Sequence, residues 1–551
     1  MHTHKKLFSR RIARQLGAIA LLFGSLAAAQ ERPNILLIMS EDMSARVGAF
    51  GDKQAVTPNL DQLATRGTRY PNTFTTAGVC APSRAAHILG VHQMSVGAHH
   101  MRTNYFKPSA YRTVPPATMK AYPELLRRAG YFTFNNSKLD YQFSTREHSG
   151  GGPFTIWDSD KRGASWRDRS DDKPFFGFIT LFDTHESKIF PENVKASNAD
   201  RVKPNIVSPA DVIVPPYFPD SPTVRNDIAQ HYANIHYMDK IVGEILLQLE
   251  KDGEAENTIV IWTTDHGDGL PRSKREIYDS GIKVPMIVYW PEQYRPKENT
   301  AGGENTRLIS FVDLGPSVLS LAGIKVPEHM HGAARLGQVN APDRTYVFAA
   351  KDRHDELLSR ERAVRSHNFK YIRNHLPGSP GGNHMNYRDR QDIMQDLWQH
   401  LEDGKLNATQ RLWFEPSPPE KLYDVINDPY EVTNLVSHPD HKKTLATLRS
   451  TLHDWQNSVG DMGEIPEIEM ARRFWPDGLQ PTTQVPLLAR NASGLVTVKN
   501  QTPHASVGYR FGSGPWLLYT APVALTKGQT AYFKAVRYGW AESTETSITM
   551  E

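Results

Sequence analysis

Apolar segments of strand length alternate with helical patterns through the first two-thirds of the chain. Residues 34–39 form a continuous apolar run, as expected of a strand buried on both faces of a sheet. Further strands are expected at 131–134, 175–182, 259–264 and 285–290, with helices at 58–66 and 228–249. This alternation predicts an α/β fold built on a large mixed, mostly parallel sheet.

Polar residues directly follow four of these predicted strands. They are Glu41 and Asp42, Lys138 and Asp140, His185, and Asp265 and His266. Ligands of open α/β sheets bind at the carboxyl ends of the strands. Carboxylates, a lysine and histidines delivered by four separate strands therefore predict a functional site at this edge of the sheet.

The chain has a single cysteine, Cys80. Pro82 and Ser83 are typical of the first turn of a helix, so Cys80 is expected at a helix N-terminus. Backbone N–H groups and the helix dipole favour a bound anion there, and Arg84 lies one turn further on. A lone cysteine in an exported chain is either a buried apolar residue or a reactive group, and these neighbours favour the reactive group.

The first 29 residues have the pattern of a signal peptide: a basic start, a short apolar run and a small-residue cleavage site. Removing their five positive charges from the net charge of +4 leaves −1 for the mature chain. No later segment is typical of a membrane span. The sequence therefore predicts a periplasmic or secreted protein that does not bind nucleic acid, in which anions are attracted by a local cluster of cations.

The remainder of the chain divides into three predicted units. Residues 30–345 form the catalytic α/β domain, and residues 346–475 form a smaller α+β subdomain. Residues 485–551 contain short aromatic strands separated by Gly, Pro and Ser, a pattern typical of a small β-sandwich.

Residues 80–84, Cys-Ala-Pro-Ser-Arg, match the C-x-P-S-R signature of the type I, formylglycine-dependent sulfatases. Five further segments resemble this family in the correct order: 32–38, 57–64, 263–267, 274–281 and 422–431. The similarity extends over about residues 32–455. The chain resembles the branch that contains heparan N-sulfatase and bacterial polysaccharide sulfatases such as those acting on ulvan. The C-terminal module resembles the terminal β-domains of chitobiase-like enzymes.

The resemblance implies an alkaline phosphatase-like sandwich and conversion of Cys80 to formylglycine (3-oxoalanine). A formylglycine-generating enzyme or an anaerobic sulfatase-maturing enzyme would be the partner for this step. The hydrated aldehyde is then the nucleophile that attacks sulfur. The implied metal ligands are Glu41, Asp42, residue 80, Asp265 and His266. Their hard oxygen donors suit Ca²⁺, with Mg²⁺ as the alternative.

The resemblance also implies roles for the remaining catalytic residues. Arg84 binds the nucleophile, Lys138 and Lys274 bind the sulfate oxygens, and His185 protonates the leaving group, with Lys274 as the competing donor. The family usually has a histidine near position 140. Here either Asp140 is the base in its place or the role falls to another residue.

Two polar segments expected in loops are candidate contacts to a sugar that carries sulfate or carboxylate groups. They comprise His99, His100 and Arg102, and Arg353 and His354. The sequence thus predicts an exported sulfatase acting on a sulfated polysaccharide or its oligosaccharides. The alternatives are a phosphate or phosphonate ester hydrolase on the same scaffold, and a non-catalytic binder of sulfated glycans.

Overall fold

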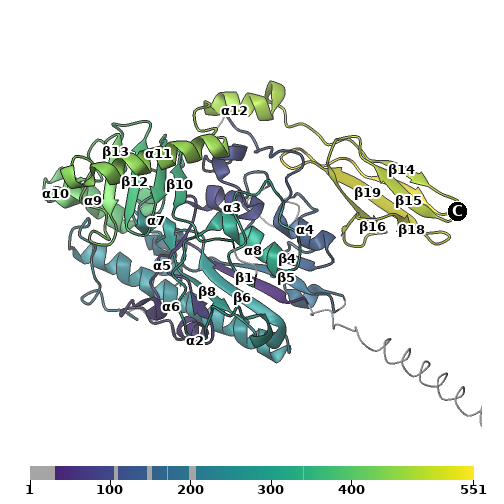
Figure 1. Cartoon of the computed structure of the whole chain (residues 1–551), viewed down its shortest axis with the longest axis horizontal. Helices are drawn as coiled ribbons and strands as arrows, with labels where there is room; N and C mark the ends of the chain where they lie inside the picture. Colours follow the sequence, from purple (N-terminus) through teal and green to yellow (C-terminus); the bar gives the residue numbers. More distant parts are fainter. Residues whose placement is uncertain (1–31, 105–108, 145–151, 171, 198–205, 339–340) are drawn as a thin grey trace, which may run out of the picture.

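The computed structural model describes residues 32–104, 109–144, 152–170, 172–197, 206–338 and 341–551 (Figure 1). The predicted signal peptide therefore lies outside the described residues. No helix in these ranges is long and apolar enough to cross a membrane.

A six-stranded sheet forms the centre of the part of the chain predicted as the catalytic domain, in the order β2-β8-β6-β1-β5-β4. The four strands β4, β5, β1 and β6 run parallel, whereas β8 is antiparallel to β6 and to β2. The predicted mixed, mostly parallel sheet is thus confirmed. Its strands are β1 (Asn34–Ser40), β2 (Thr68–Arg69), β4 (Phe132–Asn135), β5 (Phe175–Leu181), β6 (Thr258–Thr264) and β8 (Met286–Tyr289).

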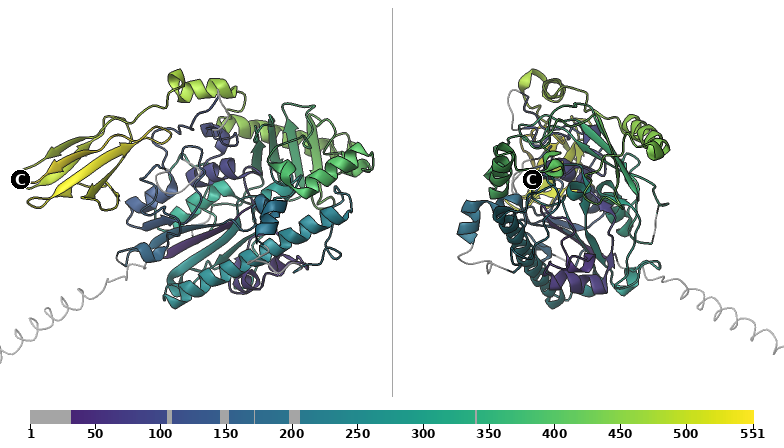
Figure 2. Two further views of the ribbon diagram at one scale, coloured as in Figure 1. Left: turned by 180° about the vertical axis from the view of Figure 1, so that it is seen from behind. Right: turned by 90° about the vertical axis from the view of Figure 1, so that its left-hand side faces the viewer.

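Helices cover both faces of this sheet (Figures 1 and 2). Because side chains alternate along a strand, Leu36 and Ile38 of β1 pack on one face with α2 and α6. Ile35 and Leu37 point to the other face, where α3, α4 and α8 lie. These helices are α2 (Pro58–Arg66), α3 (Cys80–Leu89), α4 (Tyr122–Arg128), α6 (Pro222–Lys251) and α8 (Leu314–Leu321). The sheet is therefore buried on both sides, which explains its continuous apolar strands.

The next unit is an antiparallel sheet in the order β10-β11-β12-β13 with helices packed around it. Helix α11 covers one face through Leu445, Leu448 and Leu452. On the other face, Ile372 packs against Ile277 of the catalytic domain. The elements are β10 (Val347–Lys351), β11 (Glu361–Arg365), β12 (Phe369–Asn374), β13 (Glu420–Asp424), α9 (Asp392–Glu402), α10 (Ala408–Arg411), α11 (Lys442–Val459) and α12 (Glu467–Phe474).

Two further antiparallel sheets form a β-sandwich that projects from the body of the molecule (Figure 1). Val496 and Phe533 belong to the core between these sheets. Buried Glu124 of α4 accepts hydrogen bonds from Ser506 Oγ (2.6 Å) and Tyr538 Oη (2.7 Å), so the module is docked on the catalytic domain. The strands are β14 (Leu487–Arg490), β15 (Leu495–Lys499) and β18 (Val523–Ala524) in one sheet, and β16 (Ser506–Phe511), β17 (Leu517–Leu518), β19 (Thr530–Val536) and β20 (Thr546–Thr549) in the other.

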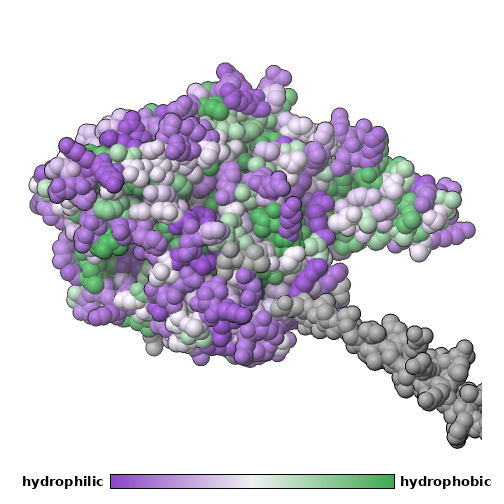
Figure 3. Space-filling view, in the orientation of Figure 1, coloured by the Kyte–Doolittle hydropathy of each residue, from purple (hydrophilic) through white to green (hydrophobic). Residues whose placement is uncertain are grey.

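The smaller elements complete the catalytic domain. Strands β3 (Thr73–Phe74), β7 (Lys283–Val284) and β9 (Ile309–Ser310) form a three-stranded sheet, and α5 (Pro191–Ser197) and α7 (Asp279–Ile282) are short helices. The face of the molecule in Figure 3 is largely hydrophilic, with hydrophobic residues scattered over it.

Candidate active site

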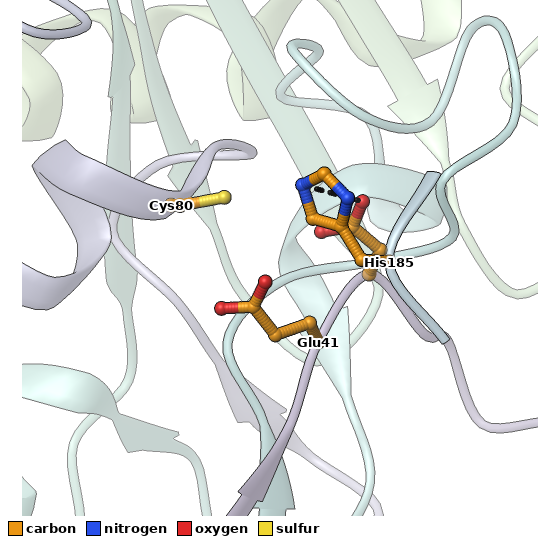
Figure 4. Close-up of side chains that lie close together, drawn as sticks. Glu41, Cys80 and His185 are labelled. Atoms are coloured by element: carbon orange, nitrogen blue, oxygen red, sulfur yellow. Dashed lines mark ion pairs between the residues drawn. The ribbon is translucent and has the colours of Figure 1, made fainter. Parts of the chain in front are cut away.

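The carboxyl ends of β1, β5 and β6 meet at one edge of the sheet, as the sequence predicted. The chain is held together there by backbone hydrogen bonds from Glu41 N to Leu181 O (3.1 Å) and from Asp265 N to Ser40 O (3.0 Å). Cys80 is the first residue of α3, after Val79 in an extended conformation. Its Sγ, the carboxylate of Glu41 and the ring of His185 face the same space (Figure 4).

Asp42, Cys80, Asp265 and His266 form a buried cluster whose ligand atoms all lie within 4.8 Å of one another. Oδ1 of Asp42 and Oδ2 of Asp265 have no hydrogen-bond donor, and neither has Oε2 of nearby Glu41. Buried carboxylate oxygens without donors are costly unless a cation balances them. The donor set therefore fits a divalent cation.

His266 provides a second indication of a cation site. Its Nδ1 lies 3.0 Å from the carbonyl oxygen of Gly267, which places the proton on Nδ1. Nε2 faces Asp42 Oδ1 at 3.1 Å, with an N–H in the protonated ring and with a lone pair in the neutral ring. Burial opposes a charge on His266, but Asp265 and Asp42 outweigh burial and raise its pKa well above the ordinary value. Protonation of His266 is one way to balance these carboxylates. A metal ion bound by Nε2 of the neutral ring and by the carboxylate oxygens is the other.

Arg84 and Lys138, two of the predicted site residues, contact this cluster through Glu41. Both donate to Oε1 of Glu41, at 2.8 Å from Arg84 and 2.7 Å from Lys138. Arg84 also lies 3.7 Å from Asp265. All of these side chains are buried, so Glu41 joins the two cations to the cluster.

Lys274 and His185 contact the cluster through Asp42. Lys274 Nζ is 2.5 Å from Asp42 Oδ2, 3.0 Å from Glu186 Oε1 and 3.4 Å from His185 Nε2. Burial opposes the charge of Lys274, but Asp42, Cys80 and Glu186 together outweigh burial and raise the lysine pKa well above the ordinary value.

His185 itself is neutral in this arrangement. Burial, followed by Lys274, holds its pKa well below the ordinary value. Its Nδ1 accepts the backbone N–H of Ser187 at 3.2 Å, so the proton of the neutral ring is on Nε2. That nitrogen faces Lys274, and the His185 side chain lines the cavity that also contains Cys80.

This cavity has a volume of about 480 Å³. Besides Cys80, His185 and Lys274, its wall contains Met101, Arg102, Glu186, Arg275, Asp355, Glu356, Asn386, Tyr387 and Arg390. The volume lies in the range of small-molecule binding sites. Cys80, His185 and Lys274 thus open onto a space that can hold more than a single inorganic anion.

Several residues around the cavity have left-handed backbone conformations, which are unfavourable for residues other than Gly. The φ angles are +48° for Asp42, +52° for Arg102, +54° for Asp140, +73° for Arg275 and +50° for Asp355. Such strain is kept where the surrounding structure fixes a functional arrangement. Asp140 is held between Lys138 (3.8 Å) and Arg102 (3.5 Å).

The structure separates the predicted sugar contacts into two groups. Arg102 lines the cavity, whereas His99, His100, Arg353 and His354 do not. His99 and His100 are buried with their rings 4.2 Å apart. The Arg353 guanidinium donates to both carboxylate oxygens of Glu467 at 2.6 Å. Nδ1 of His354 lies 3.3 Å from the backbone carbonyl oxygen of Arg275. These four side chains therefore lie outside the wall of this cavity.

Sequence reasoning did not identify Glu186, Arg275 or the wall residues Asn386, Tyr387 and Arg390. Glu186 directly follows His185 in the sequence, and Arg275 directly follows Lys274. This adjacency could have suggested both residues. The 386–390 segment has no local motif, because its place at the cavity depends on how the C-terminal subdomain packs.

A buried cluster of two carboxylates, a histidine and Cys80 lies at the edge of a mixed α/β sheet, beside a cavity whose wall contains Lys274 and three arginines. This arrangement is typical of a hydrolase of anionic esters. The model of the sulfatase family matches residues 33–324. The chain belongs to the sulfatase family and is a sulfuric ester hydrolase.

Its relatives agree with this assignment. An ulvan-active sulfatase of Formosa agariphila is 40% identical, over 93% of this chain and 90% of the relative. Human N-sulphoglucosamine sulphohydrolase is 27% identical, over 81% of this chain and 93% of the relative. Among solved structures, a 2-O glycosaminoglycan sulfatase has a TM-score of 0.54 at 19% identity, over 78% of this chain and 93% of that chain, which supports the fold.

Proposed function

We propose that this sulfatase removes sulfate groups from a sulfated polysaccharide or its oligosaccharides, of the ulvan or glycosaminoglycan type. The observation that carries the proposal is the position of Cys80, at the head of α3 and on the wall of a cavity lined with cations. The names of the two relatives, one active on ulvan and one on N-sulfoglucosamine, support the substrate class.

Residue 80 is proposed to act as formylglycine after oxidation of its thiol by a maturing enzyme. That group supplies a nucleophile for the sulfur atom and a route for release of sulfate. Arg84 lies one turn further along α3 and holds Glu41, so it keeps the carboxylates oriented around this position.

The metal is proposed to be Ca²⁺, with Mg²⁺ as the alternative, held by Glu41, Asp42, residue 80, Asp265 and His266. It would supply positive charge for the sulfate oxygens. The unpartnered carboxylate oxygens of Glu41, Asp42 and Asp265 support this ligand set.

Lys138 and Lys274 are proposed to bind sulfate oxygens, where negative charge increases during the reaction. His185 is proposed to donate the Nε2 proton to the leaving oxygen, and Lys274, 3.4 Å away, is the alternative donor. An anion bound in the cavity favours the charged form of His185, so substrate binding itself prepares the acid. Asp140 is proposed as the base that restores residue 80, and Arg102 as a contact to the sugar.

Residues 1–29 are proposed to direct export, which places the enzyme in the periplasm or outside the cell. There it would meet polysaccharide fragments from the surroundings.

The test measures sulfate release from sulfated ulvan and glycosaminoglycan oligosaccharides by wild-type enzyme and by Cys80→Ala. Wild type should release sulfate, whereas the variant should lose release and respond more weakly to Ca²⁺, because residue 80 is one of the proposed ligands, but should keep its melting temperature in the absence of Ca²⁺. Mass spectrometry of the residue-80 peptide, in protein from the native host, should find formylglycine. Hydrolysis of phosphate or phosphonate esters in preference to all sulfated substrates would contradict the proposal, as would an unmodified Cys80 in active enzyme.

A further inference from the structure

Residues 386–390 form a wall of the cavity that comes from the C-terminal subdomain. Asn386, Tyr387 and Arg390 line the same space as Cys80 and His185, although they are about two hundred residues or more away in the sequence. The Tyr387 ring packs edge-on to His185 (6.5 Å between centroids) and to Phe190 (5.2 Å). Since His185 is proposed to protonate the leaving group, this wall adjoins the part of the substrate that is released.

Arg390 extends this wall with a positive charge. Its guanidinium lies over the rings of Phe190, at 4.4 Å, and Tyr387, at 5.6 Å. It is paired with Glu192, and both side chains are about half exposed. Exposed ion pairs contribute little because water competes for both partners. An acidic group of a ligand can therefore take the place of Glu192.

The other cations of the cavity are held more firmly. Lys274 is bound to Asp42 and Glu186, and Arg275 to Glu186, as buried contacts, and Arg275 also pairs with partly buried Asp355. Arg102 has a longer contact, 3.5 Å to Asp140, and its buried Nε has no hydrogen-bond acceptor. Arg102 and Arg390 are thus the two guanidinium groups of the wall that are best able to bind a ligand.

A single sulfate at residue 80 does not need these two groups, and the cavity is larger than one sulfate. A guanidinium can bind a carboxylate or sulfate through two parallel hydrogen bonds. The apolar face of a tyrosine ring beside it suits the apolar face of a sugar.

We propose that Tyr387 and Arg390 form a subsite for the released sugar or its neighbour, and that Arg390 recognises a carboxylate there. The inference rests on the proposed action on sulfated glycans. It identifies the preferred substrates as glycans with a carboxylate besides the sulfate that is removed. Tyr387 provides the surface on which the sugar ring lies.

The test compares Arg390→Gln with wild type on three substrates: a sulfated oligosaccharide that contains a uronic acid, the same oligosaccharide with its carboxylate reduced to an alcohol, and 4-nitrophenyl sulfate. For the acidic oligosaccharide, loss of a charged hydrogen bond should raise KM about tenfold. KM for the reduced oligosaccharide and for the aryl sulfate should not change. Arg411→Gln, an exposed arginine of α10 outside the cavity, is the matched control and should leave all three values unchanged.

Three further variants sharpen the result. Glu192→Gln removes the competing carboxylate and should lower KM for the acidic oligosaccharide. Tyr387→Ala should raise KM for both oligosaccharides, whereas Tyr387→Phe keeps the ring and should behave as wild type. An Arg390→Gln variant that affects the acidic and reduced oligosaccharides equally, or neither, overturns the subsite. A wild-type enzyme that releases no sulfate from any glycan instead overturns the proposed function.

Discussion

The guanidinium of Arg275 donates to both carboxylate oxygens of Glu186, at 2.8 and 2.9 Å. Glu186 is the neighbour of His185, and its carboxylate also contacts Lys274. Arg275 donates in addition to Asp355 of the C-terminal subdomain at 2.7 Å. This arginine therefore fixes the loop that carries the proposed acid against the part of the chain that closes the cavity.

Arg275→Lys should reduce kcat by roughly a hundredfold with a smaller change in KM. Lysine cannot reproduce the two parallel bonds to Glu186, so His185 and Lys274 lose their alignment. Steady-state kinetics on one sulfated substrate provide the measurement. The control is Arg362→Lys, which alters a buried arginine bound to Asp352 and Asp461 away from the cavity. It should lower the melting temperature and preserve kcat, and equal kcat losses in both variants would contradict a positioning role for Arg275.

Removal of divalent cations should lower the melting temperature, and Ca²⁺ should restore it. The carboxylates of Glu41, Asp42 and Asp265 repel one another when no cation lies between their unpartnered oxygens. Calcium at a hundred times its Kd stabilises the folded state by about 2.7 kcal/mol. Asp265→Asn should weaken this response. Asp268→Asn, which alters a buried carboxylate paired with Arg46 and His231, should lower stability but retain the calcium response. A melting temperature unaffected by chelator, Ca²⁺ and Mg²⁺ would exclude the metal site.

The sequence identified the centre of this site because its signals are local. The strand runs predict where β1, β5 and β6 end, and Glu41, Asp42, Asp265 and His266 follow directly. The position of Cys80 on α3 likewise follows from Pro82 and Ser83. The composition of a loop, however, does not reveal which of its side chains are buried. His99 and His100 were therefore expected to contact the sugar, whereas in the structure they are buried away from the cavity wall. Arg353 pairs with Glu467, more than a hundred residues away. The 386–390 wall depends on the same long-range packing.

His185→Gln should reduce hydrolysis of sulfated sugars by about 10²- to 10⁴-fold, the usual contribution of a general acid. It should reduce hydrolysis of 4-nitrophenyl sulfate far less, because nitrophenolate leaves readily without a proton. Lys274→Met is the matched comparison and should reduce both activities, since sulfate binding is common to both substrates. If His185→Gln reduces hydrolysis of the two substrates equally, His185 is not the acid. If Lys274→Met reduces hydrolysis of sulfated sugars far more than hydrolysis of 4-nitrophenyl sulfate, Lys274 is the acid.

Asp227 should make the folded state less stable as the pH rises towards neutrality. This residue of α6 is buried, and its Oδ2 accepts the backbone N–H of Ile393 at 2.8 Å. Burial, with smaller contributions from Asp392 and Asp396, raises the pKa of Asp227 to about 7. An unfolded aspartate has a pKa of about 3.9, so between these values the folded state binds the extra proton. The stability that this proton provides is complete below about pH 4 and is lost as the pH rises to about 7.

Asp227→Asn keeps an acceptor for Ile393 and removes this titration. Melting temperatures measured from pH 5 to pH 8 should therefore fall less steeply in the variant than in wild type, and at pH 8 the variant should be at least as stable. Asp454→Asn, an exposed carboxylate of α11, serves as the control and should follow wild type. Parallel profiles for Asp227→Asn and wild type would mean that Asp227 is already charged at pH 5, with its desolvation offset by groups other than the Ile393 N–H.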